Sequence, residues 1–459
     1  MVKRGTQRPC AAILLACLAF AFVATGPSRA AVAVQQLFTN PDTQDQDDMC
    51  IWLHPTDPAL STVITSDKYA GAIFVYDLEG NLLQSLASPF PGNIDVRYGA
   101  LLGGDCMDVV AFNDRDELAL RVYAVDPVTR SLSRIDDGTI MTGSNYGFTL
   151  HRGEDGSLYG ITGPSAASAL LRQFRLFDDG TGQVDGTATG WQFQEGRVEG
   201  MVADDATGYV YLAEEDIGIW RVSLTDDTDK VMIAAVGDAS GLTADVEGLT
   251  IYKGADGTGY LIASSQGSNE FIVYDRLPPH APLGAFTIDG VGQTDGVDVL
   301  NIRLNDQFPQ GIFTFHNGQD CCPTQAVRWE EIAAQLGGLT VDTESWHPRD
   351  TCGPLLAVSG TELNWTAVAP ATSYDVIRGD LQGLHFLAGD YSAAQVDCLE
   401  NDLEALTLAW GDAPASPGDG FWMLVRGVAP FGNLPWNSFG PALVGSRDDP
   451  PTAIGNVCP

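Results

Sequence analysis

The sequence predicts an all-β protein, a six-bladed β-propeller followed by a small β-sandwich. Strand-end aromatic residues recur at intervals of 41 to 54 residues, and they are Tyr76, Tyr123, Phe174, Trp220, Tyr274 and Phe315. A period of about 40–50 residues with several short strands per unit is typical of a propeller blade. Helical periodicity is nearly absent. Six repeats predict six blades, and such a ring collects one loop from every blade at one end of its axis.

Residues 1–30 are predicted to be a secretory signal. Lys3, Arg4 and Arg8 precede an apolar run, and Ser28 and Ala30 offer small residues for cleavage. A signal anchor and a lipoprotein signal at Cys17 are the alternatives. No other apolar run is long enough to span a bilayer. We therefore expect an exported protein, extracellular or periplasmic, without a membrane span.

Residues 31–350 are predicted to form the propeller, with short strands separated by Gly, Asp and Asn turns. One short helix is expected within 327–338, ending at Gly337. The stretch 347–354 marks a boundary, and residues 355–459 are predicted to form the sandwich. The phrases "LNWTAVAPATSYDVIRGDL" and "PGDGFWMLVRG" resemble fibronectin-type-III-like modules of exported bacterial proteins. This module is expected to be a spacer or to bind a surface or a protein.

The chain is strongly acidic, with 24 Lys and Arg against 60 Asp and Glu and a net charge of −36. Removal of the predicted signal, which carries only basic charges, makes the balance more negative. Such a protein is expected to repel nucleic acid and anionic lipid and to attract cations. Most of the carboxylates are expected to form a solvated acidic surface, and the question is whether a few converge.

Nine cysteines are present, and disulfides are the default in an exported protein. We expect Cys50 to pair with Cys106, because both are read as beginning innermost strands of neighbouring repeats. We expect Cys398 to pair with Cys458. No CxxC pair exists, which argues against structural zinc. The sequence gives no sign of oligomerisation, and a monomer is expected.

Several familiar catalytic motifs are absent: GxSxG, HExxH and the P-loop signature. The six histidines are scattered and are expected to be surface or turn residues. Acidic clusters stand out instead, each at a strand boundary. "VEGMVADD" and "DVEGLTIY" place a Glu and a Gly before an apolar strand in different repeats, which aims Glu199 and Glu247 at one end of the ring. The repeat register adds Glu214, Glu215 and Asp216.

Converging carboxylates repel one another and require a cation. Hard oxygen ligands in a loose cage favour Ca²⁺ over Mg²⁺ or Zn²⁺. For any single acidic turn, solvation is the simpler interpretation. For the set at matching repeat positions, we expect binding of several calcium ions.

Eight ordered motifs between residues 45 and 350 resemble the β-propeller phytases. They are "DDMCIWLHP", "VITSDKYAGAIFVYDLEG", "GNIDVRYG", "YGFTL", "VEGMVADDATGYVYLAEEDIGIW", "DVEGLTIYKGADGTGYLIASSQGSNEFIVYDR", "TDGVDVL" and "FPQGIF". The resemblance implies a six-bladed, calcium-loaded propeller. It also implies a phosphoric monoester hydrolase of the 3-phytase type, which releases phosphate stepwise from calcium-bound phytate, myo-inositol hexakisphosphate.

The resemblance also implies site residues. Glu199, Glu215 and Glu247 would be calcium ligands at the cleavage site, with Tyr146 beside them. Further positions that hold calcium or shape the ring interior would be Asp47, Asp48, Asp95 and Asp295. Phosphate-contacting basic positions would be Lys68, Arg97 and Arg115. A multi-metal cluster can activate a water and steady the leaving oxygen, so no protein nucleophile is needed.

The chain departs from this family in three places. Pro164 and Ser165 stand where the family usually has a Lys-Glu pair, in a longer loop. Tyr69 stands where a second Lys often follows Lys68, and "FHNG" (315–318) replaces a "QDG"-like pattern. Two alternatives therefore stay open: a calcium-propeller hydrolase of another substrate, such as a lactone or phosphotriester, and a non-catalytic propeller that binds phosphorylated ligands.

Overall fold

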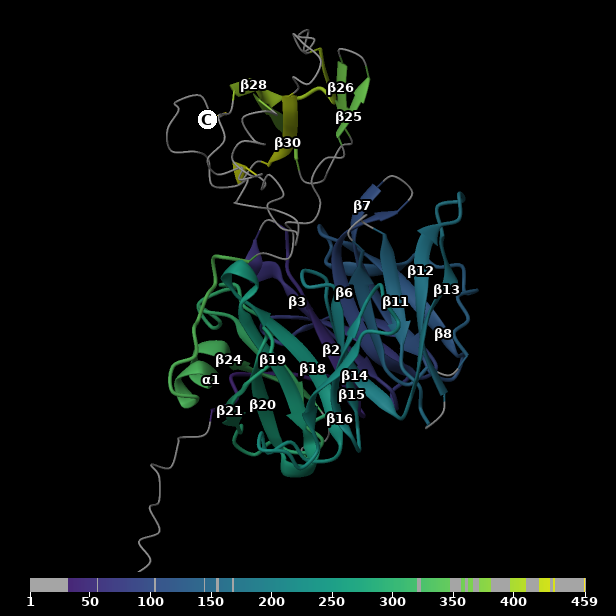
Figure 1. Cartoon of the computed structure of the whole chain (residues 1–459), viewed down its shortest axis with the longest axis vertical. Coiled ribbons are helices and arrows are strands. Elements are labelled where there is room, and N and C mark those ends of the chain that lie inside the picture. Colours follow the sequence, from purple (N-terminus) through teal and green to yellow (C-terminus); the bar gives the residue numbers. More distant parts are fainter. Residues whose placement is uncertain are drawn as a thin grey trace, which may run out of the picture. The chain divides into compact units, whose positions relative to one another are not determined.

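The computed structural model describes two stretches of the chain (Figure 1). The first comprises residues 32–346 except 56, 103–104, 144, 154–156, 167–168 and 320–322. The second comprises residues 356–359, 362–365, 371–380, 397–409, 421–429, 432–433 and 458. The predicted signal at 1–30 and the predicted boundary at 347–354 lie outside the described residues. No helix among the described residues is long and apolar enough to cross a membrane.

Six four-stranded antiparallel sheets occupy the first stretch, each built around one innermost strand. The innermost strands are β2 (Gln46–Trp52), β6 (Pro91–Leu102), β10 (Phe148–Arg152), β14 (Val198–Asp204), β18 (Val246–Lys253) and β22 (Val297–Leu300). Each of them contacts the innermost strands of the two neighbouring sheets, and β22 contacts β2. The sheets therefore form a closed ring, and the all-β, propeller-type fold predicted from the sequence is confirmed.

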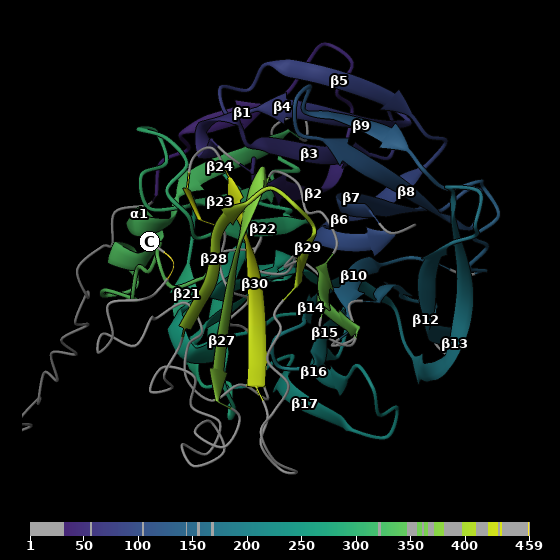
Figure 2. The ribbon, with the colours of Figure 1, turned by 90° about the horizontal axis from the view of Figure 1, so that it is seen from above.

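Three further strands extend each sheet outward (Figure 2). The second strands are β3 (Thr62–Asp67), β7 (Asp105–Asp114), β11 (Leu158–Thr162), β15 (Tyr209–Glu214), β19 (Gly259–Ser265) and β23 (Ile312–His316). The third strands are β4 (Ala72–Asp77), β8 (Ala119–Asp126), β12 (Ala169–Asp178), β16 (Gly218–Ser223), β20 (Glu270–Asp275) and β24 (Thr324–Arg328). The outer strands are β5 (Leu82–Ala87), β9 (Ser131–Arg134), β13 (Val184–Glu195), β17 (Lys230–Ala235), β21 (Pro282–Phe286) and β1 (Gln36–Phe38).

Burial decreases from the axis outward. Every residue of β2, β3 and β4 is buried, whereas β5 alternates between exposed and half-buried positions. Inner strands covered on both faces favour continuous apolar runs, and a solvated outer strand favours mixed composition. Hydrophobic side chains of adjacent sheets pack together between the sheets, as Phe74 and Phe112 do within one cluster.

The repeating aromatic residues mark the third strand in five sheets. In the last sheet the pattern shifts, because Phe315 lies on the second strand, β23. The cause is the way the ring closes. The last sheet takes its outer strand, β1, from the beginning of the chain, and Gln36 pairs with Ala326 of β24. The predicted helix is α1 (Trp329–Gln335), and Gly337 follows it at a φ of 86°.

Short 3₁₀ turns join some of the strands: η1 (Pro58–Leu60), η2 (Ala255–Gly257) and η3 (Gln266–Ser268). At η1, Asp57 accepts a hydrogen bond from the backbone of Ala59, and Pro58 opens the turn. These are the residue types that start helical turns, because they satisfy or remove unpaired N–H groups.

The second stretch contains two antiparallel sheets. One comprises β25 (Leu356–Ser359), β26 (Glu362–Trp365) and β29 (Thr407–Ala409). The other comprises β28 (Asp397–Leu403), β27 (Ser373–Asp380), β30 (Phe421–Ala429) and β31 (Gly432–Asn433). Leu363 and Trp365 of the first sheet share a core with Tyr374, Val376 and Val425 of the second. The two sheets share one core, and the predicted sandwich domain at 355–459 stays a prediction.

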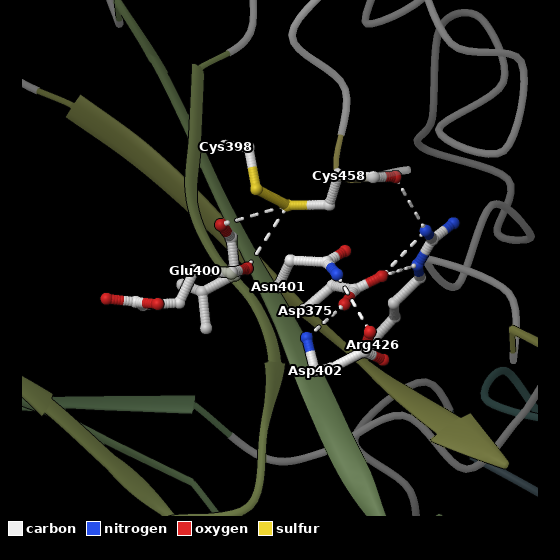
Figure 3. The surroundings of a disulfide bond; sticks show 8 residues. Asp375, Cys398, Glu400, Asn401, Asp402, Arg426 and Cys458 are labelled. Carbon is white, nitrogen blue, oxygen red and sulfur yellow. Dashed lines mark hydrogen bonds and ion pairs between the residues drawn. A yellow bond between two sulfur atoms is a disulfide. The ribbon is translucent and has the colours of Figure 1, made fainter.

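Cys398 and Cys458 form the predicted disulfide (Figure 3). Beside it, Arg426 Nε donates to Asp375 Oδ2 at 2.8 Å. The predicted Cys50–Cys106 disulfide is wrong, because Cys50 is a free, buried thiol. The prediction placed both residues at the beginning of innermost strands. In fact Cys50 lies within innermost strand β2, whereas Cys106 lies in the second strand β7, opposite Leu101.

Candidate active site

Charged residues gather at the end of the ring where the innermost strands begin and the second strands end. We call this the site end. Three of its carboxylate residues stand in β-bulges: Asp47 in β2, Glu199 in β14 and Glu247 in β18. The pairing register shifts between Gln46 and Asp48, between Val198 and Met201, and between Val246 and Leu249. A bulge places an extra residue on one strand and re-aims its side chain.

A glycine follows each of four site residues, and it permits the innermost strands to approach closely. A Cβ on Gly200 would lie 2.0 Å from the backbone oxygen of Glu247, and a Cβ on Gly248 would lie 2.5 Å from that of Asp295. Gly147 and Gly296 are equally crowded by the next strand of the ring. The motif of a site residue followed by Gly is therefore a packing requirement as well as a chemical one.

The central feature is a buried triad of Glu199, Glu215 and Glu247, which we call the Glu triad. One carboxylate oxygen from each residue lies within 4.8 Å of the others. Glu199 and Glu247 come from the bulges, and Glu215 directly follows β15. The sequence analysis predicted this convergence, and the structure brings the three residues together.

The Glu triad carries more negative charge than its neighbours balance. Burial raises the pKa of Glu215 to about 7; Arg197 opposes the shift and Glu199 adds to it. Burial also raises the pKa of Glu199, against the attraction of Arg115. Burial raises the pKa of Glu247 well above its usual range, and the other nearby carboxylates raise it further. Glu215 Oε1 and Glu247 Oε2 are buried without a hydrogen-bond partner.

Tyr146 and Arg115 border the Glu triad. Tyr146 lies beside Glu199 and Glu215, and burial together with the negative charge of Glu199 raises the pKa of this tyrosine. Arg115 lies over the Tyr146 ring, 4.6 Å from its centroid. Its Nη2 forms ion pairs with Glu199 and, at 3.1 Å, with Asp47 Oδ2. Arg115 thus links the Glu triad to the carboxylates of the first sheet.

A second cluster surrounds Lys68. Its Nζ lies 2.6 Å from Asp47 Oδ1, 3.2 Å from Asp45 Oδ2 and 3.7 Å from Asp295 Oδ2. Burial opposes the charged form of Lys68, but Asp47 and Asp295 outweigh it and raise its pKa. His316 Nδ1 lies 3.2 Å from Asp295 Oδ2, so this cluster also contains an imidazole.

Glu214 and Asp48 are among the predicted residues that the structure leaves apart from the Glu triad. Glu214 precedes Glu215 in the chain, and successive side chains of a strand point to opposite faces. Its carboxylate accepts hydrogen bonds from Gly196 N–H at 3.0 Å and from Trp220 Nε1–H at 2.8 Å. Asp48 accepts a hydrogen bond from Ile94 N–H at 3.1 Å between two innermost strands.

Asp95 and Arg97 pair with each other. Arg97 Nη1 lies 2.8 Å from Asp95 Oδ1, and its Nε lies 3.0 Å from Asp205 Oδ2. Asp205 follows the last residue of β14, whereas Glu199 is the second residue of that strand. At about 3.3 Å per residue, roughly 20 Å separates the two positions. Arg97 is therefore held away from the Glu triad.

Sequence reasoning did not find His316 or Arg197. Four of the six histidines, His316 among them, are buried rather than at the surface, and they are His54, His151, His280 and His316. A positional signal was available, because second strands end at the site. The residues directly after five of them are Lys68, Arg115, Gly163, Glu215 and Gln266, and His316 ends the sixth. Gln266 Nε2 donates to Asp295 Oδ1.

The donor set fits a hard cation. Its nearest ligands are carboxylate oxygens, two of which are buried without hydrogen bonds, and burying such charges unpaired is costly. Carboxylates suit Mg²⁺, Ca²⁺ or Mn²⁺. The flanking Lys68 and Arg115 suit an anionic ligand. The arrangement can hold a cation and an anion side by side.

Comparison with known proteins agrees with this chemistry. Residues 15–350 match the model of the Phytase family. A 3-phytase from Bacillus subtilis (strain 168) is 36% identical over 326 residues, which cover 66% of this chain and 84% of the relative.

Two solved structures resemble the fold at 12% sequence identity. A luciferin-regenerating enzyme has a TM-score of 0.42 and covers 66% of this chain and 94% of its own. A calcium-binding protein, regucalcin, from Agrobacterium tumefaciens strain C58 has a TM-score of 0.40 and covers 68% of this chain and 97% of its own. Scores of this size carry no inference about the site.

Proposed function

Because the chain belongs to the phytase family, we propose that it is a secreted, calcium-dependent phytase acting on phytate. Family membership makes it a phosphoric monoester hydrolase. In the overall reaction, water oxygen bonds to phosphorus, the ester P–O bond breaks, and the inositol oxygen leaves with a proton. The observation that supports the proposal most strongly is the Glu triad, with unpartnered oxygens beside Arg115.

Glu199, Glu215 and Glu247 are proposed to hold calcium, with Asp47 and Asp295 available on the neighbouring sheets. When bound, calcium supplies charge neutralisation and activation of a water molecule. The chain's own residues orient the reactants. Tyr146 borders Glu199 and Glu215, and Arg115 and Lys68 favour a phosphate at the site end.

Calcium also explains how an acidic protein takes an acidic substrate. The chain carries a net charge of −36, which alone would repel phytate. Cations held by the Glu triad would reverse the local sign. The predicted signal at residues 1–30 supports secretion, and the C-terminal sheets are proposed to attach the enzyme to a surface or protein.

The test is phosphate release from phytate at neutral pH, with calcium, with excess chelator, and after return of calcium or magnesium. We expect calcium-restored release. Glu215→Gln should lower kcat/KM by more than about 100-fold, since even outer-shell changes at metal sites cost about 10–100-fold. Asp306→Asn, which removes a fully exposed carboxylate outside the Glu triad, should retain activity.

Four outcomes would redirect the proposal. Full activity in Glu215→Gln would show that the site assignment is wrong. Restoration by magnesium but not calcium would refute the metal assignment. Binding of phytate without phosphate release by the calcium-loaded protein would favour the non-catalytic alternative, whereas release from other esters alone would favour another substrate.

A further inference from the structure

Arg197 belongs to the site end although no motif pointed to it. It lies directly before β14, two residues from Glu199. Its Nη2 forms an ion pair with Glu215 Oε2. Its backbone oxygen accepts a hydrogen bond from Glu215 N–H at 3.1 Å. Both the main chain and the side chain of Arg197 are therefore fixed against a member of the Glu triad.

Arg197 differs from the other two cations that pair with the site carboxylates. Lys68 approaches three carboxylates and is 19% exposed, and Arg115 approaches two and is 12% exposed. The Arg197 side chain is 46% exposed and forms one ion pair in the described structure. A guanidinium offers five N–H donors in a planar fork that matches phosphate. Part of the Arg197 side chain is therefore accessible to a soluble ligand.

Among the described residues, the third sheet contributes no cation to the site end next to Arg197. The residue after its second strand is Gly163, which offers no side chain where other sheets offer Lys68, Arg115 or Glu215. A Cβ on Gly163 would lie 2.3 Å from the backbone oxygen of Val198, so no larger residue fits. Pro164 O accepts a hydrogen bond from Val198 N–H at 3.1 Å. The uncharged segment thus lies beside the residue that follows Arg197.

We infer that Arg197 is a substrate-binding residue, which contacts a phosphate group beside the Glu triad and supplies the cation that the Gly163–Pro164 segment lacks. The inference rests on the proposed function and adds a residue to the proposed site. The simpler interpretation is that Arg197 only balances the charge of Glu215. The two differ in what the side chain recognises, a phosphate or a carboxylate ligand of the metal.

The experiment compares Arg197→Gln and Arg197→Lys with the wild type. Arg303→Gln is the matched control, because Arg303 is an exposed arginine (62%) paired with Asp306 at 3.0 Å. Three quantities are measured: KM and kcat for phytate at saturating calcium, the Kd of myo-inositol hexasulfate, and the calcium affinity. The hexasulfate carries six sulfate esters in place of phosphates and reports binding without turnover.

We expect Arg197→Gln to raise both KM and the hexasulfate Kd about tenfold, as for loss of one charge-assisted hydrogen bond. Arg197→Lys should recover part of this loss, and Arg303→Gln should match the wild type. Unchanged KM and Kd in Arg197→Gln, with an altered calcium affinity, would overturn the inference in favour of charge balancing.

The inference and the proposed function can fail separately. A wild-type protein that binds hexasulfate but releases no phosphate would refute the phytase activity, and its Kd would still test Arg197. An active wild type whose Kd does not respond to Arg197→Gln would refute the inference alone.

Discussion

Glu247 shows how a single residue can lower the stability of the folded protein that contains it. Glu247 is buried in a β-bulge, and Glu199, Asp295 and Glu215 are its main electrostatic neighbours, all negative. An unpaired buried carboxylate is costly, and its pKa rises so that it is partly neutralised. Such a position is typical of a functional site rather than of a structural ion pair.

Glu247→Gln should therefore separate stability from function. Without metal, the variant should be more stable than the wild type, because one source of repulsion is removed, by about 1 kcal/mol. With calcium, the wild type should gain more stability than the variant. Thermal unfolding of both proteins with chelator and with calcium checks this, and a lower Tm for the variant in chelator would contradict it.

The burial of His151 leads us to expect that the folded protein loses stability at acidic pH. This histidine is buried in β10 and stacked on Tyr159, with ring centroids 4.6 Å apart. Burial lowers its pKa from 6.5 to about 4, although Asp205 opposes the shift. The unfolded chain then binds a proton that the folded chain does not, so stability falls as the pH drops from about 6.5 to about 4.

The size of this effect is at most about 3 kcal/mol, from 1.36 kcal/mol per pKa unit. Urea unfolding at pH 7 and pH 4.5 measures it. His151→Gln should be less stable than the wild type at pH 7, but its stability should fall by less between pH 7 and pH 4.5. An equal loss in both proteins would show that other groups carry the acid sensitivity.

At the scale of elements, the innermost strands are joined by the glycines that follow the site residues. These glycines are needed for space, because the neighbouring backbone occupies the position of a Cβ. The sequence pattern of Glu followed by Gly thus reports strand packing and site geometry together. This is why two short motifs sufficed to predict that Glu199 and Glu247 converge.

Gly200→Ala should disturb β14 and β18 together. Its Cβ would lie 2.0 Å from the backbone oxygen of Glu247, so the strands must separate. We expect a loss of about 3 kcal/mol in the free energy of unfolding, as for overpacked cores, and weaker calcium binding. Gly190→Ala is the control, because nothing lies within 4 Å of its Cβ position. Unchanged calcium affinity in Gly200→Ala would contradict this account.

Periodicity predicted the strands well but not their exact rank within a sheet. Phe315 follows the aromatic repeat yet lies on the second strand of its sheet, because β1 completes that sheet from the other end of the chain. Cys106 was assigned to the beginning of an innermost strand, although it lies in the second strand, β7. A one-dimensional period records spacing along the chain, and closure of a ring adds a pairing that spacing does not contain.

Spacing along the chain also predicted only part of the site. The Glu triad was predicted because its members share a motif or a repeat position. Arg197 and His316 were not, because neither belongs to an acidic motif, and each meets its carboxylate across two neighbouring strands of one sheet. Glu214 was included by the repeat register, although strand alternation turns it towards Trp220. Arg97 pairs with Asp205, a contact between sheets that no local pattern encodes.

At the scale of the whole molecule, negative charge dominates, with a net charge of −36. Like charges destabilise a compact state, and bound cations or salt reduce that repulsion. Chelation should therefore lower the Tm, and 1 M NaCl should restore part of the loss without restoring activity. Differential scanning calorimetry with phosphate-release assays checks both statements. A Tm that does not respond to chelator would contradict the proposed calcium sites.

The pairing of β1 with β24 also sets an order of events. The third residue of β1, Phe38, pairs with Thr324 of β24. The first strand of the ring therefore cannot pair until its last strand has been made. Pairing across such a long chain separation slows folding. During synthesis the nascent chain therefore cannot close the ring until β24 has been made, and β1 stays without its partner strand until then.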